Sequence, residues 1–346
     1  MKKFIPLLIC ILFSCNLLQN QETSKAKGYT IAFYNVENLF DTEDDPAIDD
    51  QEFLPSSEKQ WDAVKYNKKL ADLSKVISAI SPENLPAIVG FAEVENRKVV
   101  EDLIIQQDLK KAPYQVVHEN SPDGRGIDVA LIYRSDLFQY ITHSSIPVAL
   151  PNVSPNDTFK TRDILYVKGL MDKKDTLHIF VNHWPSRTGG EAESEPKRMA
   201  AALRLRSQVD SLLLINKDSK ILIMGDMNDE PQNKSLRQGL QTADTKEALT
   251  SEKLYNLMYD KDLQNEGTYN FRGQWNMLDN LVVSSSLING KRGFVVADAT
   301  GHIFREEWLM YKNNNGELSP NRTYGGNKYF GGYSDHLPVY TNLVKR

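Results

Sequence analysis

The sequence of 346 residues predicts a single α/β domain over residues 28–346, with mixed β-sheets and helices packed outside them. Three observations favour this class. The expected strands outnumber the helices, and several strands follow one another directly, which is not typical of a doubly wound parallel sheet. No linker-like break, internal repeat or low-complexity tract divides residues 28–346. The composition, 40% hydrophobic and 25% charged, is ordinary for a globular protein large enough to fold without disulfides or a structural metal.

The elements are expected in a definite order. A strand over 29–34 ends in an Asn-Glu-Asn turn, and the acidic stretch 41–53 is expected to form an exposed loop. Helical spacing of apolar residues predicts a helix over 62–80, and the apolar strand in PAIVGFAEVEN leads to a helix over 97–109. Further strands are expected in YQVVHE, IDVALIY, DILYVKGL and LHIFVNH. A long helix near 195–215 precedes strands at 220–224 and in MLDNLVVSS, and the chain closes with YSDHLPVYTNLV.

The first 27 residues are expected to lie outside this domain. MKKFIPLLICILFSC has two lysines, a short apolar stretch and a small residue before Cys15, which is the pattern of a bacterial lipoprotein signal. We therefore expect residues 1–14 to be a signal peptide, Cys15 to carry the lipid and residues 15–27 to be a tether. An ordinary secretory signal or an uncleaved anchor is the alternative. The predicted location is the bacterial cell envelope, on the periplasmic face or the cell surface.

Cysteine content and charge exclude some kinds of chemistry. Cys10 and Cys15 are the only cysteines, so the domain has no thiol for a disulfide, a nucleophile or a zinc site. The formal net charge is −5, and loss of Lys2 and Lys3 with the signal peptide would leave 39 basic and 46 acidic residues, a net charge of −7. Such a domain does not attract nucleic acid through its overall field, so a polyanionic substrate would need metal ions and local arginines.

Polar and ionisable side chains gather at the expected strand ends. They are Asn35, Glu37, Glu93, Asn182, His183, Asp226, Asn228, Ser334, Asp335 and His336, with Asp279 at the start of a further apolar run. Singly, each could be a turn, cap or packed residue. If the sheets bring them together, however, the carboxylates would repel one another unless a cation lay among them. Oxygen donors without cysteine select Mg²⁺, or else Mn²⁺ or Ca²⁺, and nearby histidines favour metal-assisted hydrolysis of a phosphate ester.

Six segments resemble a known superfamily. YNVEN, GFAEVEN, VNHWPSR, GDMND, MLDNLVVS and YSDHLPV occur in the order found in the endonuclease/exonuclease/phosphatase superfamily, from about Tyr29 to Val339. The resemblance implies a deoxyribonuclease-I-like fold, a four-layer α/β/β/α sandwich of two mixed sheets flanked by helices. It implies Glu93 as the principal metal ligand, with Asn35, Glu37 and Asp335 near the same ion or a second one.

The same resemblance implies roles for the other strand-end residues. Asp226 would orient or deprotonate the attacking water, and Asn228 would hold that water or a phosphate oxygen. Asp279 would pair with His336, which would face the phosphate across from the metal, and His183 would donate to a phosphoryl oxygen. The identity of the general base stays open.

Arginines and tyrosines offer further candidate contacts. Arg125, in a glycine-flanked loop, and Arg187, close to His183, are predicted to bind substrate, and Arg162 and Arg272 are weaker candidates. Three tyrosines, Tyr324, Tyr329 and Tyr333, could stack on bases or cover the core.

The predicted function is divalent-metal-dependent hydrolysis of phosphodiester bonds by an exported nuclease acting on DNA or RNA. The alternatives are a phosphatase, a lipid-headgroup phosphodiesterase, or an inactive binding protein of the same fold. The expected partners are the phosphodiester substrate and, through the lipid anchor, the membrane.

Overall fold

The computed structural model describes Met1 and residues 28–151, 160–313 and 315–346. Apart from Met1, the predicted signal peptide (1–14), Cys15 and the tether (15–27) lie outside the described residues. Among the helices that are described, none has both the length and the apolar character required to span a bilayer.

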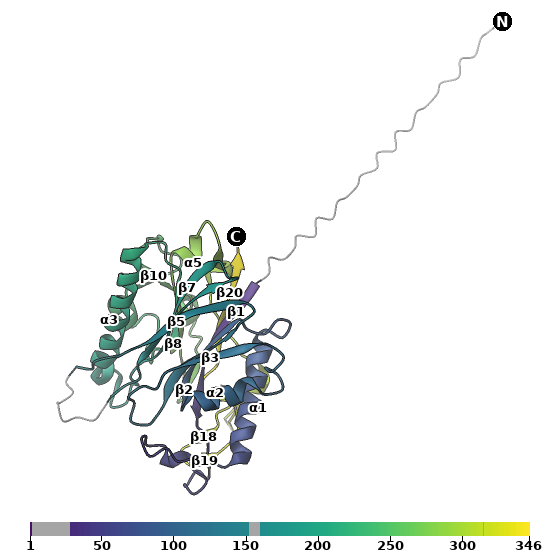
Figure 1. The fold of residues 1–346 in the computed structure, drawn as a ribbon. Helices are drawn as coiled ribbons and strands as arrows, with labels where there is room; N and C mark the ends of the chain where they lie inside the picture. Colours follow the sequence, from purple (N-terminus) through teal and green to yellow (C-terminus); the bar gives the residue numbers. More distant parts are fainter. Residues whose placement is uncertain (2–27, 152–159, 314) are drawn as a thin grey trace.

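Two seven-stranded sheets form the centre of the domain (Figure 1). The first follows the order β14 (Phe294–Val296), β20 (Val339–Lys345), β1 (Gly28–Leu39), β2 (Ile88–Val94), β4 (Asp128–Arg134) and β3 (Tyr114–His118), with β15 (His302–Ile303) paired to β20. The second follows the order β5 (Phe138–Ile146), β6 (Ile164–Met171), β7 (Asp175–His183), β8 (Ile221–Asp226), β13 (Asp279–Ser284), β10 (Leu254–Asn256) and β9 (Thr242–Asp244). Both sheets are mixed, because the β1–β2 and β7–β8 pairs are parallel whereas β1–β20 and β8–β13 are antiparallel.

Helices and small ribbons surround the sheets. The described α-helices are α1 (Ala63–Ile80), α2 (Arg97–Ile104), α3 (Glu191–Ile215), α4 (Tyr259–Leu263) and α5 (Ser286–Asn289). Short 3₁₀ turns lie at Gln51–Phe53, Ala297–Ala299 and Glu307–Leu309, and a π-helical turn lies at Ser235–Gly239. Three two-stranded ribbons pair β11 (Tyr269–Phe271) with β12 (Gln274–Asn276), β16 (Met310–Lys312) with β17 (Leu318–Pro320), and β18 (Tyr324–Gly325) with β19 (Lys328–Tyr329).

Side chains of the central strands alternate between two buried layers. On β8, Leu222 and Met224 lie in the core between the sheets, whereas Ile221 and Ile223 pack under α3. The strand β1 alternates in the same way between the central core and the layer under α1 and α2. Because both faces are buried, these strands read as continuous apolar runs in the sequence. The predicted four-layer sandwich of two mixed sheets flanked by helices is confirmed (Figure 1).

Some element boundaries differ from those predicted. The first strand continues to Leu39 instead of stopping at residue 34, and the helix expected over 97–109 ends at Ile104. The edge strand β5 was not predicted, because most of its side chains face solvent and give no apolar pattern. The acidic stretch after β1 is mostly exposed as expected, but Asp41 and Asp50 are buried.

Candidate active site

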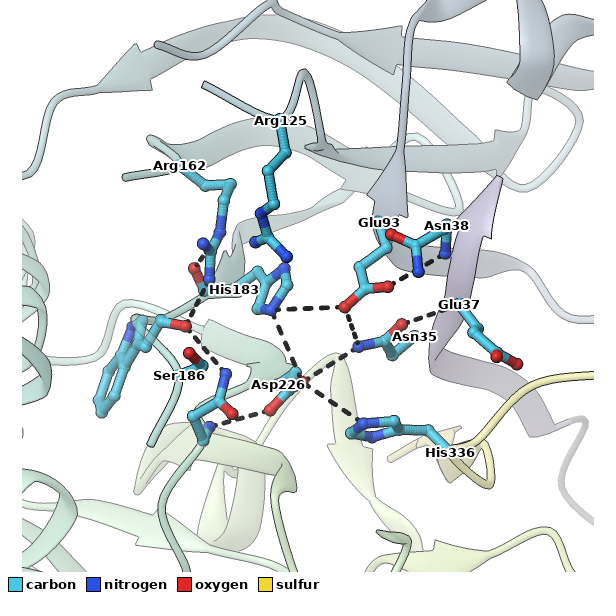
Figure 2. Close-up of polar contacts among 12 residues, drawn as sticks. Asn35, Glu37, Asn38, Glu93, Arg125, Arg162, His183, Ser186, Asp226 and His336 are labelled. Carbon is cyan, nitrogen blue, oxygen red and sulfur yellow. Dashed lines mark hydrogen bonds and ion pairs between the residues drawn. The ribbon is translucent and has the colours of Figure 1, made fainter. Parts of the chain in front are cut away.

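The predicted strand-end residues converge on one edge of the sandwich (Figure 2). In the parallel β7–β8 pair His183 lies beside Asp226, and in the antiparallel β8–β13 pair Asp279 lies opposite Asp226. Asn35 of β1 joins the two sheets, because its Nδ2 donates to Asp226 Oδ2 at 3.1 Å. Parallel strands end at a common edge, so the topology itself brings these residues together.

The backbone at this edge has several left-handed non-glycine residues. Glu37, Asn38 and Glu93 have left-handed φ angles of 51°, 52° and 64°, and Asn228 has a φ of 49°. The register between β1 and β2 shifts between Asn35 and Leu39, and that between β2 and β4 shifts between Ala92 and Val94. Bulges of this kind re-aim side chains, and left-handed non-glycine residues gather at functional sites.

A hydrogen-bonded cluster links Asn35, Glu93 and Asp226. Asn35 Nδ2 also donates to Glu93 Oε1 at 3.3 Å, and the backbone amide of Asn38 donates to Glu93 Oε2 at 3.0 Å. The amide of Asn228 donates to Asp226 Oδ1 at 2.9 Å, while the Asn228 side chain donates to the carbonyl of Trp184 at 2.9 Å. The two carboxylates are therefore fixed on either side of Asn35.

Two imidazoles approach Asp226 from opposite sides. Nε2 of His183 lies 3.8 Å from Asp226 Oδ2 and 3.9 Å from Glu93 Oε1, and Nε2 of His336 lies 3.7 Å from Asp226 Oδ2. Nδ1 of His336 contacts Asp279 Oδ2 at 2.7 Å, which fixes the orientation of that ring. Tyr269 adds a ring contact that the sequence did not predict, with its centroid 4.9 Å from that of His336.

The two histidines differ in charge. Burial lowers the pKa of His183 well below its usual value, and the nearby Arg162 and Arg125 lower it further, so this ring is neutral. Burial also opposes ionisation of His336, but Asp279 and Asp226 outweigh it and hold the His336 pKa well above its usual value. Burial raises the pKa of Asp226 to about 6, an effect that His336 partly offsets. The edge thus presents one neutral and one cationic imidazole.

The donor set fits a hard divalent cation. Glu93 and Asn35 supply oxygen donors. The neighbouring carboxylates lack compensating positive charge, since burial and then Glu37 raise the pKa of Asp335 to about 7. Asp226, Asp279 and His336 are also close enough together to share an ion, with ligand atoms within 4.8 Å of one another. Because Asp279 engages Nδ1 of His336, Nε2 is the ring atom left to face an ion in that group.

Glu37 and Asp335 form a second acidic group beside the first. The amides of Thr323 and Tyr324 donate to the Glu37 carboxylate at 2.7 and 3.1 Å. Arg322 lies 3.5 Å from Glu37 Oε1 and 2.9 Å from Asp335 Oδ2. In Figure 2 the Glu37 carboxylate points away from Glu93, so the structure does not place these two carboxylates around one point.

A buried lysine anchors the segment that carries Asp335 and His336. Nζ of Lys69, on α1, donates to Thr323 Oγ1 and to the carbonyl of Tyr333, each at 2.6 Å. Burial lowers the pKa of Lys69 to about 8, although Glu37 and Asp335 favour the charged form. Ser334 Oγ donates to the carbonyl of Asn35 at 2.7 Å and so ties the same segment to β1. Helical spacing marks only the apolar face of α1, so it does not predict the buried Lys69.

Arg162 is a buried support of the site. Its guanidinium pairs with Asp123 at 2.9 Å and donates to the carbonyls of His183 and Trp184 at 3.1 and 2.6 Å. The Trp184 carbonyl is also the acceptor for Asn228, so this one arginine braces both His183 and Asn228. Arg162 was a weaker candidate for substrate contact, but the residue is only 4% exposed, so it is not placed to meet substrate.

Replacing Arg162 with methionine should lower the free energy of unfolding by about 3–5 kcal/mol, since it removes the buried partner of Asp123 and one donor from each of the His183 and Trp184 carbonyls. The matched control is Arg125→Met, because Arg125 pairs with the same carboxylate at 3.4 Å but has a side chain that is 57% exposed. That change should cost less than about 1 kcal/mol. Urea denaturation measures both, and equal midpoints for the two variants would contradict the supporting role of Arg162.

The other sequence candidates lie at different distances from the cluster. Arg125 reaches toward His183 (Figure 2), whereas Arg187 donates to the Asn228 carbonyl at 2.8 Å and to Asn233 at 3.2 Å, bracing the turn after β8. Arg272 lies at the turn of the β11–β12 ribbon. Of the tyrosines, Tyr324 is buried and Tyr329 and Tyr333 are half-buried, packed against the layer under α1.

Asp229, in the segment GDMND, has a structural role. Its carboxylate pairs with the fully buried Arg198 at 2.7 Å, and Ser235 Oγ donates to it at 2.5 Å. No local sequence pattern pairs Asp229 with a helix some thirty positions earlier.

Comparisons with known proteins agree with this geometry. Residues 30–345 match the model of a family described as Endonuclease/Exonuclease/phosphatase family. No curated protein matches the sequence significantly.

Three solved structures are similar in fold. A humanized Danio rerio (D. rerio) TDP2 has a TM-score of 0.55 at 12% identity, covering 91% of this chain and 98% of its own. The human Nocturnin catalytic domain has a TM-score of 0.53 at 16% identity, with 92% and 95% coverage. The Bacteroides thetaiotaomicron mannosyl-6-phosphatase Bt3783 has a TM-score of 0.55 at 15% identity, with 91% and 99% coverage.

Proposed function

The chain belongs to the endonuclease/exonuclease/phosphatase family, and from this premise we propose that it is a divalent-metal-dependent phosphodiesterase acting on DNA or RNA. The observation that carries the proposal is the meeting of Glu93, Asp226 and His336 around Asn35 and His183. Hydrolysis of a phosphate ester needs a group that orients the attacking water and positive groups facing the phosphoryl oxygens, and this cluster has side chains suited to both tasks.

Each side chain has a chemical task in this proposal. Glu93 and Asn35 would hold the metal ion, which supplies positive charge against a phosphoryl oxygen when it is bound. Asp226 accepts or orients the proton of the attacking water, because its raised pKa and position between two imidazoles suit proton transfer. His183 donates from Nε2 to a phosphoryl oxygen without adding net charge.

The second imidazole stabilises negative charge. The cationic His336, held through Nδ1 by Asp279, directs Nε2 toward the space beside Asp226. A charged donor fixed before the reaction stabilises developing negative charge without reorganisation. Arg125, whose side chain is 57% exposed and reaches toward His183, would contact a substrate phosphate.

Purified protein with Mg²⁺ should hydrolyse bis(p-nitrophenyl) phosphate and either DNA or RNA, and EDTA should reduce each rate to the uncatalysed level. Added Mg²⁺ should restore activity, because all ligands proposed here are side chains present in the apo protein. Sphingomyelin, inositol phosphates and phosphomonoesters belong in the same panel. Cleavage of the diester but of neither nucleic acid would reject the nuclease assignment, and activity unchanged by EDTA would reject metal dependence.

A small-phosphoester hydrolase is the second candidate. The formal net charge of −5 opposes long-range attraction of a polyanion, which favours a smaller substrate. A binding protein without catalysis is disfavoured, because the full set of ionisable groups is assembled.

We also propose attachment to the cell envelope through lipid on Cys15. Mass spectrometry of the mature N-terminus should find acylated Cys15, and an intact, unmodified sequence upstream of Cys15 would exclude this attachment.

A further inference from the structure

A pocket of about 150 Å³ opens beside the acidic edge of the site. Its lining includes Asn38, Phe53, Lys59, Trp61, Arg322 and Tyr324. The walls come from the segment after β1 and from the β18 ribbon, which lie together at one end of the sandwich (Figure 1). The pocket adjoins the proposed metal site, since the amide of Asn38 donates to Glu93 Oε2 at 3.0 Å.

Lys59 is held in place by aromatic rings. Its Nζ lies 5.0 Å from the ring centroid of Phe53 and 5.7 Å from that of Tyr324, and its side chain is only 12% exposed. The Tyr324 hydroxyl donates to the Lys59 carbonyl at 2.8 Å, which fixes the backbone as well. A partly desolvated ammonium attracts an anion more strongly than one in bulk water.

The carboxylate paired with Lys59 can be displaced. Glu52 contacts Nζ at 2.7 Å, but the Glu52 side chain is 72% exposed, so the pair is screened by solvent and weak. An incoming anion can replace Glu52 without leaving a buried charge behind.

Arg322 supplies a second cation, and the acid in the wall is already compensated. The Glu37 carboxylate accepts from the amides of Thr323 and Tyr324, and Arg322 lies between Glu37 and Asp335. The Arg322 side chain remains 44% exposed, so part of its guanidinium faces the pocket or solvent. The pocket thus offers two cations, and its acid makes most of its contacts inside the wall.

We propose that this pocket binds a second phosphoryl group of the substrate, next to the phosphate that is cleaved, with Lys59 as its main contact. The inference rests on the proposed function and refines it. A cavity of 150 Å³ is about the size that accepts a benzene-sized molecule, so it accommodates a hydrated phosphoryl group but not a nucleoside. The second phosphate belongs either to a nucleic acid backbone or to a small molecule with two phosphates.

The test compares substrates that differ only in the second phosphate. Lys59→Met should lower kcat/KM at least about tenfold for a dinucleotide that carries a terminal phosphate. For the same dinucleotide without the terminal phosphate, and for bis(p-nitrophenyl) phosphate, kcat/KM should stay within about twofold of wild type. Lys59→Arg should retain most of the preference. The control Lys246→Met removes a lysine that is 69% exposed and paired with Asp260, and it should change neither rate. A parallel pair, a nucleoside bisphosphate and the corresponding monophosphate, reports a small-molecule source.

The possible outcomes are distinguishable. Equal loss on both substrates of a pair makes Lys59 a structural residue and overturns the inference, as does a wild type that ignores the second phosphate in both pairs. If the wild-type protein cleaves no substrate, the proposed function is rejected. Calorimetric measurement of ligand binding then tests the second phosphate site by itself. The inference stands if the wild type binds nucleoside 3′,5′-bisphosphate more tightly than the 5′-monophosphate and Lys59→Met loses this difference. Equal binding of the two ligands by the wild type would overturn the inference.

Discussion

Replacing Asp226 with asparagine should lower kcat by about 100- to 10,000-fold and leave the protein folded. The amide has the same shape and keeps an oxygen to accept from the Asn228 amide, but it can neither take a proton nor carry the charge that His336 and His183 face. The loss should fall on kcat more than on KM, because the carboxylate is proposed to act on the water and not to hold the substrate.

Steady-state kinetics with bis(p-nitrophenyl) phosphate measures this effect, with urea denaturation as the check on folding. Glu230→Gln is the matched control, since it removes a carboxylate from the same turn whose contacts are Asn276 at 3.2 Å and Arg187 at 3.7 Å. It should change kcat by less than about threefold. A folded Asp226→Asn protein with near-normal turnover would mean that another group activates the water.

The α/β class with mixed sheets was predictable from local patterns, whereas the four-layer sandwich was implied by the family resemblance. Continuous apolar runs such as residues 221–224 mark strands buried on both faces, and helical spacing marks the buried side of α1. Once several such strands end in polar residues, the meeting of those ends follows from the sheet topology. Asn35, Glu93, His183, Asp226, Asp279 and His336 could therefore be selected together from the sequence.

The remaining features depend on contacts that no local pattern encodes. The left-handed backbone of Glu93 and the bulge beside it decide where that carboxylate points. The predicted ligand Glu37 accepts from the amides of Thr323 and Tyr324, almost three hundred residues later. The sequence does not distinguish an arginine that contacts substrate, as proposed for Arg125, from a buried arginine that donates to two backbone carbonyls, as Arg162 does.

Gly225→Ala is expected to lower the free energy of unfolding by about 3 kcal/mol or more. Gly225 precedes Asp226 on β8 and pairs with Asn182 on β7. A Cβ at this position would lie 2.4 Å from the Asn182 carbonyl oxygen and 2.7 Å from the Asn182 Cβ. These atoms belong to the neighbouring strand, so the clash can be relieved only by separating β7 from β8, which also moves His183 away from Asp226.

Urea denaturation and turnover together test this prediction. Gly124→Ala is the matched control, because a Cβ there meets no atom within 4 Å, and its stability should stay within about 0.5 kcal/mol of wild type. Displacing a catalytic pair by about 1 Å can cost 100-fold in rate, so the fraction of Gly225→Ala that folds should also be slow. A variant that is both stable and active would mean that the two strands can separate without harm, and that the glycine before Asp226 is not needed for the site geometry.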